Sequence, residues 1–208
     1  MLSISTLSER LEALNAGSGG VYSTSDLSVV LDRPRPSRLT EAIGALLAGG
    51  VLLRLRRGLY VDRLRGYRPE IAGLRWVAPS YLSTETALDR HRLCETGILA
   101  FTFVTTRLIA RCGQAVRRLE GREFVFRHIA PHLFFGFQAA DGGLLMADPE
   151  KSALDFLYFH YKKHRSVVAV ADIDFSRLDA ARYRRYLQAY RQAGFSDYAL
   201  GRLAGAER

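Results

Sequence analysis

The 208-residue chain contains 48% hydrophobic and 25% charged residues, a balance typical of folded globular proteins, which excludes a disordered or fibrous chain. Its length suits two ordinary domains. No apolar run approaches the roughly 18 residues of a membrane span, and the first residues lack a signal-peptide pattern, so we expect a cytoplasmic protein. The net charge of +9, carried mostly by arginine, indicates a polyanionic partner such as nucleic acid.

Three short helices are predicted in the first fifty residues. Hydrophobic residues at three- and four-residue spacing mark the first helix: Ile4, Leu7, Leu11 and Leu14. A glycine-rich turn at 17–20 ends it. The second helix begins at Ser23, which has capping-box spacing with Asp26, and a proline-rich turn ends it. The third begins at Ser37 and ends at the glycine pair 49–50.

The third predicted helix has one apolar face and one face of mixed, mostly small side chains. The apolar face consists of Leu39, Ile43, Leu46 and Leu47. The opposite face consists of Ser37, Arg38, Glu41, Ala45 and Ala48. Because few bulky side chains obstruct this second face, the helix suits the DNA major groove, with its N-terminal residues nearest the base edges.

Two short strands, 51–55 and 59–62, are predicted around a hairpin tip that contains Arg56 and Arg57. Three helices followed by a basic hairpin is the order of a winged helix-turn-helix domain, which we place at residues 1–68. The predicted DNA contacts are Arg35, Ser37, Arg38, Glu41, Arg54, Arg56 and Arg57. Two alternatives stay open here, because some winged helices bind proteins and arginines at a hairpin tip are often simply solvated.

Residues 75–208, after a basic link at 63–69, predict a larger mixed α/β domain, so the expected fold class is α+β or α/β. Its predicted helices lie near 84–91, 149–162 and 179–192. Its predicted strands lie near 101–106, 123–129, 133–139 and 143–147.

The block from Asp148 to Asp155 has a structural explanation. Asp148 suits a helix N-cap, Pro149 the first helical position and Glu150 the first turn. Lys151 lies four residues before Asp155, a spacing at which the two side chains pair on one helix. Ion pairing therefore explains these residues better than catalysis, and we expect no enzyme.

Histidines and cysteines give no metal or cofactor signal. Two histidine pairs lack a third ligand, and two cysteines match no metal or disulfide spacing. These residues are His128, His132, His160, His164, Cys94 and Cys112. We expect no catalytic residue, no metal and no cofactor.

A stripe of tyrosines with arginines beside it runs along the predicted helix 179–192. Such stripes are usually core with a solvated rim, but tyrosine and arginine also anchor protein interfaces. The candidate partner-binding residues are Arg182, Tyr183, Arg185, Tyr186 and Tyr190. An acidic partner or additional DNA phosphates would suit the arginines.

Several short sequence segments, taken together and in their order along the chain, carry a resemblance to a known family. In the first domain they are 22–27, 38–39, 46–52 and 56–61. In the second they are 81–83, 87–88, 101–106, 126–129, 133–136 and 147–155, the last reading Ala-Asp-Pro-Glu-Lys-Ser-Ala-Leu-Asp. Over about residues 20–160 the chain resembles the AbiEi-like antitoxin family of type IV toxin–antitoxin systems.

The resemblance implies an N-terminal domain that binds inverted repeats in the operator of a toxin–antitoxin operon. It also implies a C-terminal domain that counteracts a nucleotidyltransferase-like toxin. We expect a monomer, or a dimer assembled on double-stranded DNA. The alternative is a stand-alone winged-helix regulator whose C-terminal domain senses a ligand, and a nucleic-acid enzyme is the third hypothesis.

Overall fold

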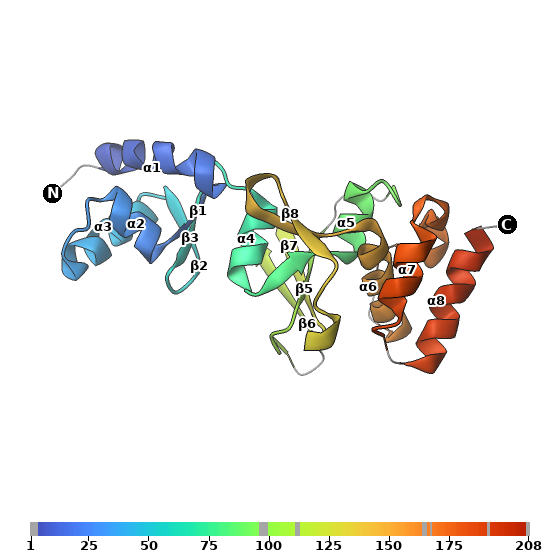
Figure 1. The fold of residues 1–208 in the computed structure, drawn as a ribbon. Coiled ribbons are helices and arrows are strands. Elements are labelled where there is room, and N and C mark those ends of the chain that lie inside the picture. Colours follow the sequence, from blue (N-terminus) through green and yellow to red (C-terminus); the bar gives the residue numbers. More distant parts are fainter. Residues whose placement is uncertain are drawn as a thin grey trace. The chain divides into compact units, whose positions relative to one another are not determined.

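The computed structural model describes residues 4–95, 100–110, 113–163, 166, 168–190 and 192–206. The protein is a mixed α+β structure that divides into two compact units, Met1–Trp76 (unit 1) and Val77–Arg208 (unit 2) (Figure 1). Within the described ranges, no helix is both long and apolar enough to cross a membrane.

Unit 1 consists of helices around a small antiparallel sheet. Its helices are α1 (Ile4–Ser18), α2 (Thr24–Val30), α3 (Pro36–Ala48) and α4 (Pro69–Trp76). Its strands are β1 (Val21–Ser23), β2 (Leu52–Arg56) and β3 (Leu59–Asp62), in the order β1-β3-β2. The three helices and two hairpin strands predicted from the sequence are confirmed, whereas β1 and α4 were not predicted. Because α4 packs on β1 and β3, unit 1 extends beyond the predicted boundary at residue 68.

The apolar faces of α1, α2 and α3 meet in one core with the sheet. Its buried members are Leu11, Tyr22, Leu27, Leu31, Ile43, Leu46, Val51, Leu52 and Tyr60. The predicted capping box is present at the start of α2, where the Asp26 amide donates to Ser23 Oγ and the Ser23 amide donates to Asp26 Oδ2. This exchange fixes the point at which β1 ends and α2 begins.

Unit 2 is built on a six-stranded mixed sheet with strand order β6-β7-β5-β4-β9-β8. The strands are β4 (Ser80–Leu82), β5 (Ala100–Thr105), β6 (Gln114–Leu119), β7 (Arg122–His128), β8 (Phe137–Ala140) and β9 (Leu144–Ala147). Pairs β4/β9 and β5/β7 are parallel, and the other neighbours are antiparallel. The helices are α5 (Thr84–Arg90), α6 (Pro149–Tyr161), α7 (Ala180–Leu187) and α8 (Ala193–Ala206).

Two element predictions in unit 2 were wrong. The segment 133–139 is not one strand, because a short 3-10 turn begins at Pro131 and the chain enters β8 only at Phe137. The segment 179–192 is not one helix, because α7 ends at Leu187 and the chain turns before α8. Strands β4 and β6 and helix α8 were missed.

The Asp155 carboxylate is the polar centre of unit 2. It is fully buried and accepts hydrogen bonds from the Tyr81 hydroxyl, the Ser83 hydroxyl and the Tyr190 hydroxyl, each at 2.8 Å. Lys151 Nζ, also fully buried, donates to Asp155 Oδ1 at 2.5 Å and to Tyr190 Oη at 2.6 Å. The predicted pairing of Lys151 with Asp155 is therefore confirmed. Burial lowers the pKa of Lys151, and the Asp155 carboxylate opposes that effect.

We predict that Asp155→Ala destabilises the protein far more than Tyr190→Phe. Removing the carboxylate leaves the Lys151 cation buried without a counter-ion, which costs about 3–5 kcal/mol. Removing the Tyr190 hydroxyl costs about 1 kcal/mol, because the ion pair survives. Urea unfolding followed by circular dichroism measures both, with the exposed carboxylate of Asp197 as the matched control, Asp197→Ala, expected within about 0.5 kcal/mol of wild type. Equal losses from Asp155→Ala and Asp197→Ala would contradict the central role of Asp155.

Candidate nucleic-acid interface

Helix α3 presents a polar face at its N-terminal end. Ile43 and Leu46 are buried on its inner side, whereas Ser37, Arg38 and Glu41 are exposed. Arg35, at the N-cap position, is exposed as well and makes no side-chain capping hydrogen bond. Pro36, the first residue of α3, has no N–H, so the first backbone donors of the helix are the N–H groups of Ser37 and Arg38, and no side chain at the N-cap accepts from them. Free N–H groups at a helix N-terminus favour an anion such as a phosphate.

The charged side chains on this face do not pair with other described residues of the chain. Arg38 and Glu41 are three residues apart, a spacing at which arginine and glutamate commonly pair on a helix. Among the residues that the structure describes, neither makes an ion pair or a side-chain hydrogen bond. Arg35 is unpaired in the same sense. Both signs of charge are thus available to an external ligand.

The C-terminal half of the same face is small. Gly44 is exposed, and a Cβ added to it would meet nothing within 4 Å. Ala45 is half-buried and Ala48 is exposed. With no bulky side chain projecting from this part, the helix can approach a grooved surface closely.

The β2–β3 hairpin carries the other predicted contacts, and its three arginines differ. Arg54 and Arg57 are exposed, with the Arg54 guanidinium 5.8 Å from the centre of the Tyr60 ring. Arg56 is exposed too, but its guanidinium donates to the Arg75 carbonyl at 3.3 Å and to the Arg57 carbonyl at 3.4 Å. The structure thus places Arg56 partly against α4.

Sequence reasoning missed Arg75, which lies in α4 and joins three elements. Its guanidinium donates to the Val21 carbonyl of β1 at 2.5 Å and to Asp26 Oδ2 of α2 at 2.9 Å. Its own carbonyl accepts from Arg56 of the hairpin. Partial burial opposes ionisation of Asp26, but the bonds from the Ser23 amide and the Arg75 guanidinium outweigh it and lower the pKa of this carboxyl. No sequence signal marked this contact, because Asp26, the third residue of a capped helix, is already explained by its capping role and its partner Arg75 is distant in the sequence.

The predicted partner face on helix 179–192 needs correction. Tyr183 and Tyr190 are buried core residues whose hydroxyls donate to the Ala199 carbonyl and to Asp155. Tyr186 is half-buried and donates to Asp148 Oδ2 at 2.8 Å. Tyr183 and Tyr186 lie on α7, and Tyr190 follows the end of that helix. Acceptors within the unit satisfy all three hydroxyls, so the buried Tyr183 and Tyr190 are not available to a partner.

The two arginines of that prediction lie closer to the surface. Arg182 is half-buried, 3.4 Å from a Glu150 carboxylate oxygen. Arg185 is exposed, with its guanidinium 5.7 Å from the centre of the Tyr186 ring. Cys112 and His164 lie outside the described residues.

The block that begins at Asp148 serves the fold. Asp148 caps α6 by accepting from the Lys151 amide, as predicted, and burial raises the pKa of its carboxyl. Glu150 is buried and accepts from the Asp179 amide at 2.8 Å. These contacts connect α6 to α7, and Lys151 has no exposed surface through which to meet a substrate.

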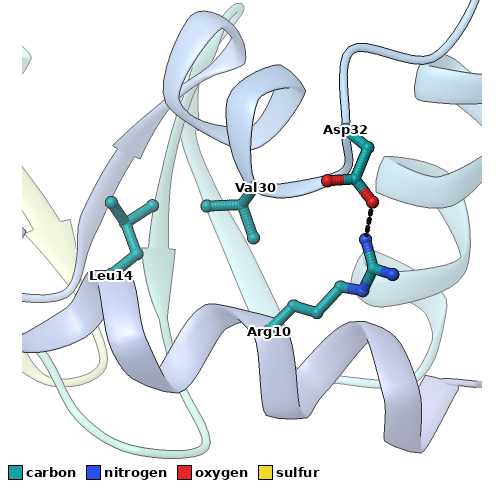
Figure 2. Close-up of a pocket in the computed structure, with 4 residues that line it drawn as sticks. All are labelled: Arg10, Leu14, Val30 and Asp32. Carbon is teal, nitrogen blue, oxygen red and sulfur yellow. Dashed lines mark hydrogen bonds and ion pairs between the residues drawn. The ribbon is translucent and has the colours of Figure 1, made fainter.

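An open hollow of about 480 Å³ lies on unit 1 beside α1. Figure 2 shows Leu14 and Val30 along it and Arg10 paired with Asp32 across it. Because each of these two charged groups already has its partner in the other, the hollow offers few convergent polar groups to a ligand, unlike a typical binding pocket.

In comparisons with known proteins, no family model matches this chain, and a search of curated proteins finds no match either. A functional assignment consequently depends on the charges and contacts described above.

We predict that Arg75→Ala loosens the junction between α2 and the hairpin. The variant loses charged hydrogen bonds at a partly exposed site, which should reduce stability by about 1–2 kcal/mol. Hydrogen exchange of the Thr24 amide, which donates to the Gly58 carbonyl at 3.1 Å, reports on this junction directly and should become faster. The control is Arg10→Ala, whose ion pair with Asp32 is exposed and should contribute less than about 0.5 kcal/mol.

The stability difference between wild type and Arg75→Ala should also depend on pH. Since the pKa of Asp26 is lowered on folding, its contribution is complete above the unfolded carboxyl pKa of about 4 and is lost as the pH falls through the folded value. Urea unfolding at a series of pH values from 7 down to 2 measures this. A difference that stays constant over the whole series would show that the carboxylate does not hold Arg75.

Proposed function

We propose that this protein is a cytoplasmic DNA-binding transcriptional repressor and antitoxin, in which unit 1 is a winged helix-turn-helix domain. The observation that carries the DNA-binding half is the N-terminal end of α3, where unpaired guanidiniums stand beside uncapped backbone N–H groups. Helix α3 would lie in the major groove of operator DNA, and the β2–β3 hairpin would form the wing.

The charges of unit 1 support this docking. The proposed contacts include five arginines, Arg35, Arg38, Arg54, Arg56 and Arg57, against the single acid Glu41. Each phosphate that an arginine neutralises releases condensed counter-ions, and this release drives association with DNA of any sequence. The order α2, α3, β2, β3 with β1 beside β3 also agrees with a helix-turn-helix followed by a wing.

The antitoxin half rests on the sequence resemblance. Unit 2 has its own hydrophobic core, which favours a separate task for it. We propose that this task is binding a nucleotidyltransferase-like toxin, while unit 1 binds inverted operator repeats as a monomer or as a dimer assembled on the DNA. If no toxin is encoded beside the gene, a stand-alone regulator with a ligand-sensing unit 2 becomes the better assignment.

Two measurements on the full chain test the proposal. Fluorescence anisotropy with the DNA upstream of its own coding sequence should show tighter binding than with a shuffled duplex of equal composition. Co-expression with the product of the neighbouring gene should restore growth if that product is a toxin. Equal affinity for the two duplexes would remove the repressor assignment, and growth arrest unrelieved by the full chain would remove the antitoxin assignment.

We predict that Arg57→Ala weakens binding to specific and shuffled DNA by similar factors. The exposed guanidinium reaches phosphates rather than bases, so the slope of log K against log salt should become shallower by about 0.9. Anisotropy across a salt series measures the slope. Arg118→Ala in unit 2 is the matched control, because that guanidinium already pairs with Glu123. A slope that stays at the wild-type value in Arg57→Ala would exclude the hairpin tip from the interface.

We predict that the two activities reside in different units. Residues 1–76 should retain weak DNA binding, whereas relief of toxicity should require residues 77–208. Weak binding is expected because repressors read paired half-sites, and a lone unit forfeits any pairing that the full chain provides. Relief of toxicity by residues 1–76 alone would contradict this division of labour.

A further inference from the structure

Glu41 is an unexpected residue on a surface that meets DNA. Its carboxylate is exposed on the same face as Arg38, and within the described part of the chain it has no cationic partner. If the Glu41 carboxylate faced the DNA backbone, it would only repel the negatively charged phosphates. A favourable contact requires a hydrogen-bond donor, and the major groove offers donors only on bases, as the amino groups of cytosine and adenine.

The neighbouring Arg38 has a complementary requirement. Its guanidinium is an unpaired fork of donors, and the base edge that accepts two such donors at once is guanine, through O6 and N7. Adenine is read by asparagine or glutamine, and α3, with sequence Pro-Ser-Arg-Leu-Thr-Glu-Ala-Ile-Gly-Ala-Leu-Leu-Ala, contains neither. The chemistry of Glu41 and that of Arg38 therefore both favour G·C base pairs.

The rise between the two residues is larger than one base-pair step and smaller than two. Three residues advance an α-helix by about 4.5 Å, whereas successive base pairs are about 3.4 Å apart. Side chains at positions 38 and 41 therefore reach neighbouring pairs. Beyond them Gly44, Ala45 and Ala48 leave room for the groove wall, so nothing on this face holds the helix away from the bases.

We propose that α3 selects operators that present a guanine to Arg38 and, in the adjacent base pair, a cytosine to Glu41. The guanidinium donates to guanine O6 and N7, and the carboxylate accepts from the cytosine N4 amino group. This inference rests on the proposed DNA-binding function and adds the chemical identity of the bases that are read.

The experiment begins with selection of bound duplexes from a random library by the full-length wild-type chain, followed by anisotropy on the preferred duplex. Replacing the assigned guanine by 7-deazaguanine removes its N7 acceptor. Replacing the assigned cytosine by N4-methylcytosine removes the amino hydrogen not used in base pairing. Each replacement should weaken wild-type binding by roughly 5- to 150-fold.

Variants assign each base to its residue. Arg38→Ala should lose the effect of 7-deazaguanine and keep that of N4-methylcytosine. Glu41→Gln should do the opposite, and it should change the preferred base from cytosine to adenine, because a glutamine amide pairs with adenine N6 and N7. Glu12→Gln, an exposed glutamate on α1, is the matched control and should leave the base preference unchanged. Both tested side chains are exposed, and thermal unfolding verifies that the variants remain folded.

The outcomes separate this inference from the function on which it rests. If the wild-type chain selects no sequence and binds no duplex, both are overturned. If it selects a site whose affinity responds to neither base analogue, the repressor assignment stands and the inference is wrong. Equal loss on all sequences in Arg38→Ala would show a phosphate contact only. Equal gain on all sequences in Glu41→Gln would show simple repulsion and overturn the cytosine assignment.

Discussion

Strand β3 is the element on which unit 1 depends. Every residue from Leu59 to Asp62 is buried, and the strand pairs with β1 on one side and with β2 on the other. Strand β1 runs into α2 through the Ser23 cap, and β2 follows α3. A single buried strand therefore sets where the helices and the hairpin lie relative to each other.

The end of β3 is held by polar contacts rather than by apolar packing. Asp62 is fully buried and accepts from the Tyr22 hydroxyl at 3.0 Å and from the Arg65 amide at 2.9 Å. Burial and the neighbouring Asp62 raise the pKa of Tyr22, so its hydroxyl stays protonated and continues to donate. These buried hydrogen bonds lie in the interior of unit 1, and they hold in place the strand that forms one side of the proposed wing.

Local signals in the sequence predicted much of this architecture. Helical spacing of leucines, the Ser23–Asp26 cap and the glycines after α3 each act within a few residues, so they identified α1, α2, α3 and the hairpin. The exposed face of α3 followed from the same periodicity. Contacts between distant segments were not predictable in this way. Arg75 meets Asp26 across 49 residues of sequence and Tyr81 meets Asp155 across 74, and no local pattern marks either pair.

The tyrosines at positions 183 and 190, one on α7 and one just after it, show the same limit of local sequence patterns. Tyrosine and arginine at helical spacing describe an interface and a core with a solvated rim equally well. What distinguishes them is whether an acceptor lies beneath each hydroxyl, and the acceptors for Tyr183 and Tyr190 come from α8 and α6. Helix α8, which supplies the first, was not predicted at all, so the burial of this face could not be anticipated.

The contact between Lys151 and Tyr190 has a consequence for the order in which the chain folds during its synthesis. The two residues are 39 positions apart, and a ribosome adding 5–20 residues per second needs roughly 2–8 s to pass from one to the other. During that interval the Lys151–Asp155 pair lacks its last hydrogen-bond partner. All residues of unit 1 lie within the first 76 positions, so the whole unit has been synthesised before Lys151 is added. Unit 1 can therefore fold on the nascent chain well before unit 2 can form the hydrogen bond between Lys151 and Tyr190.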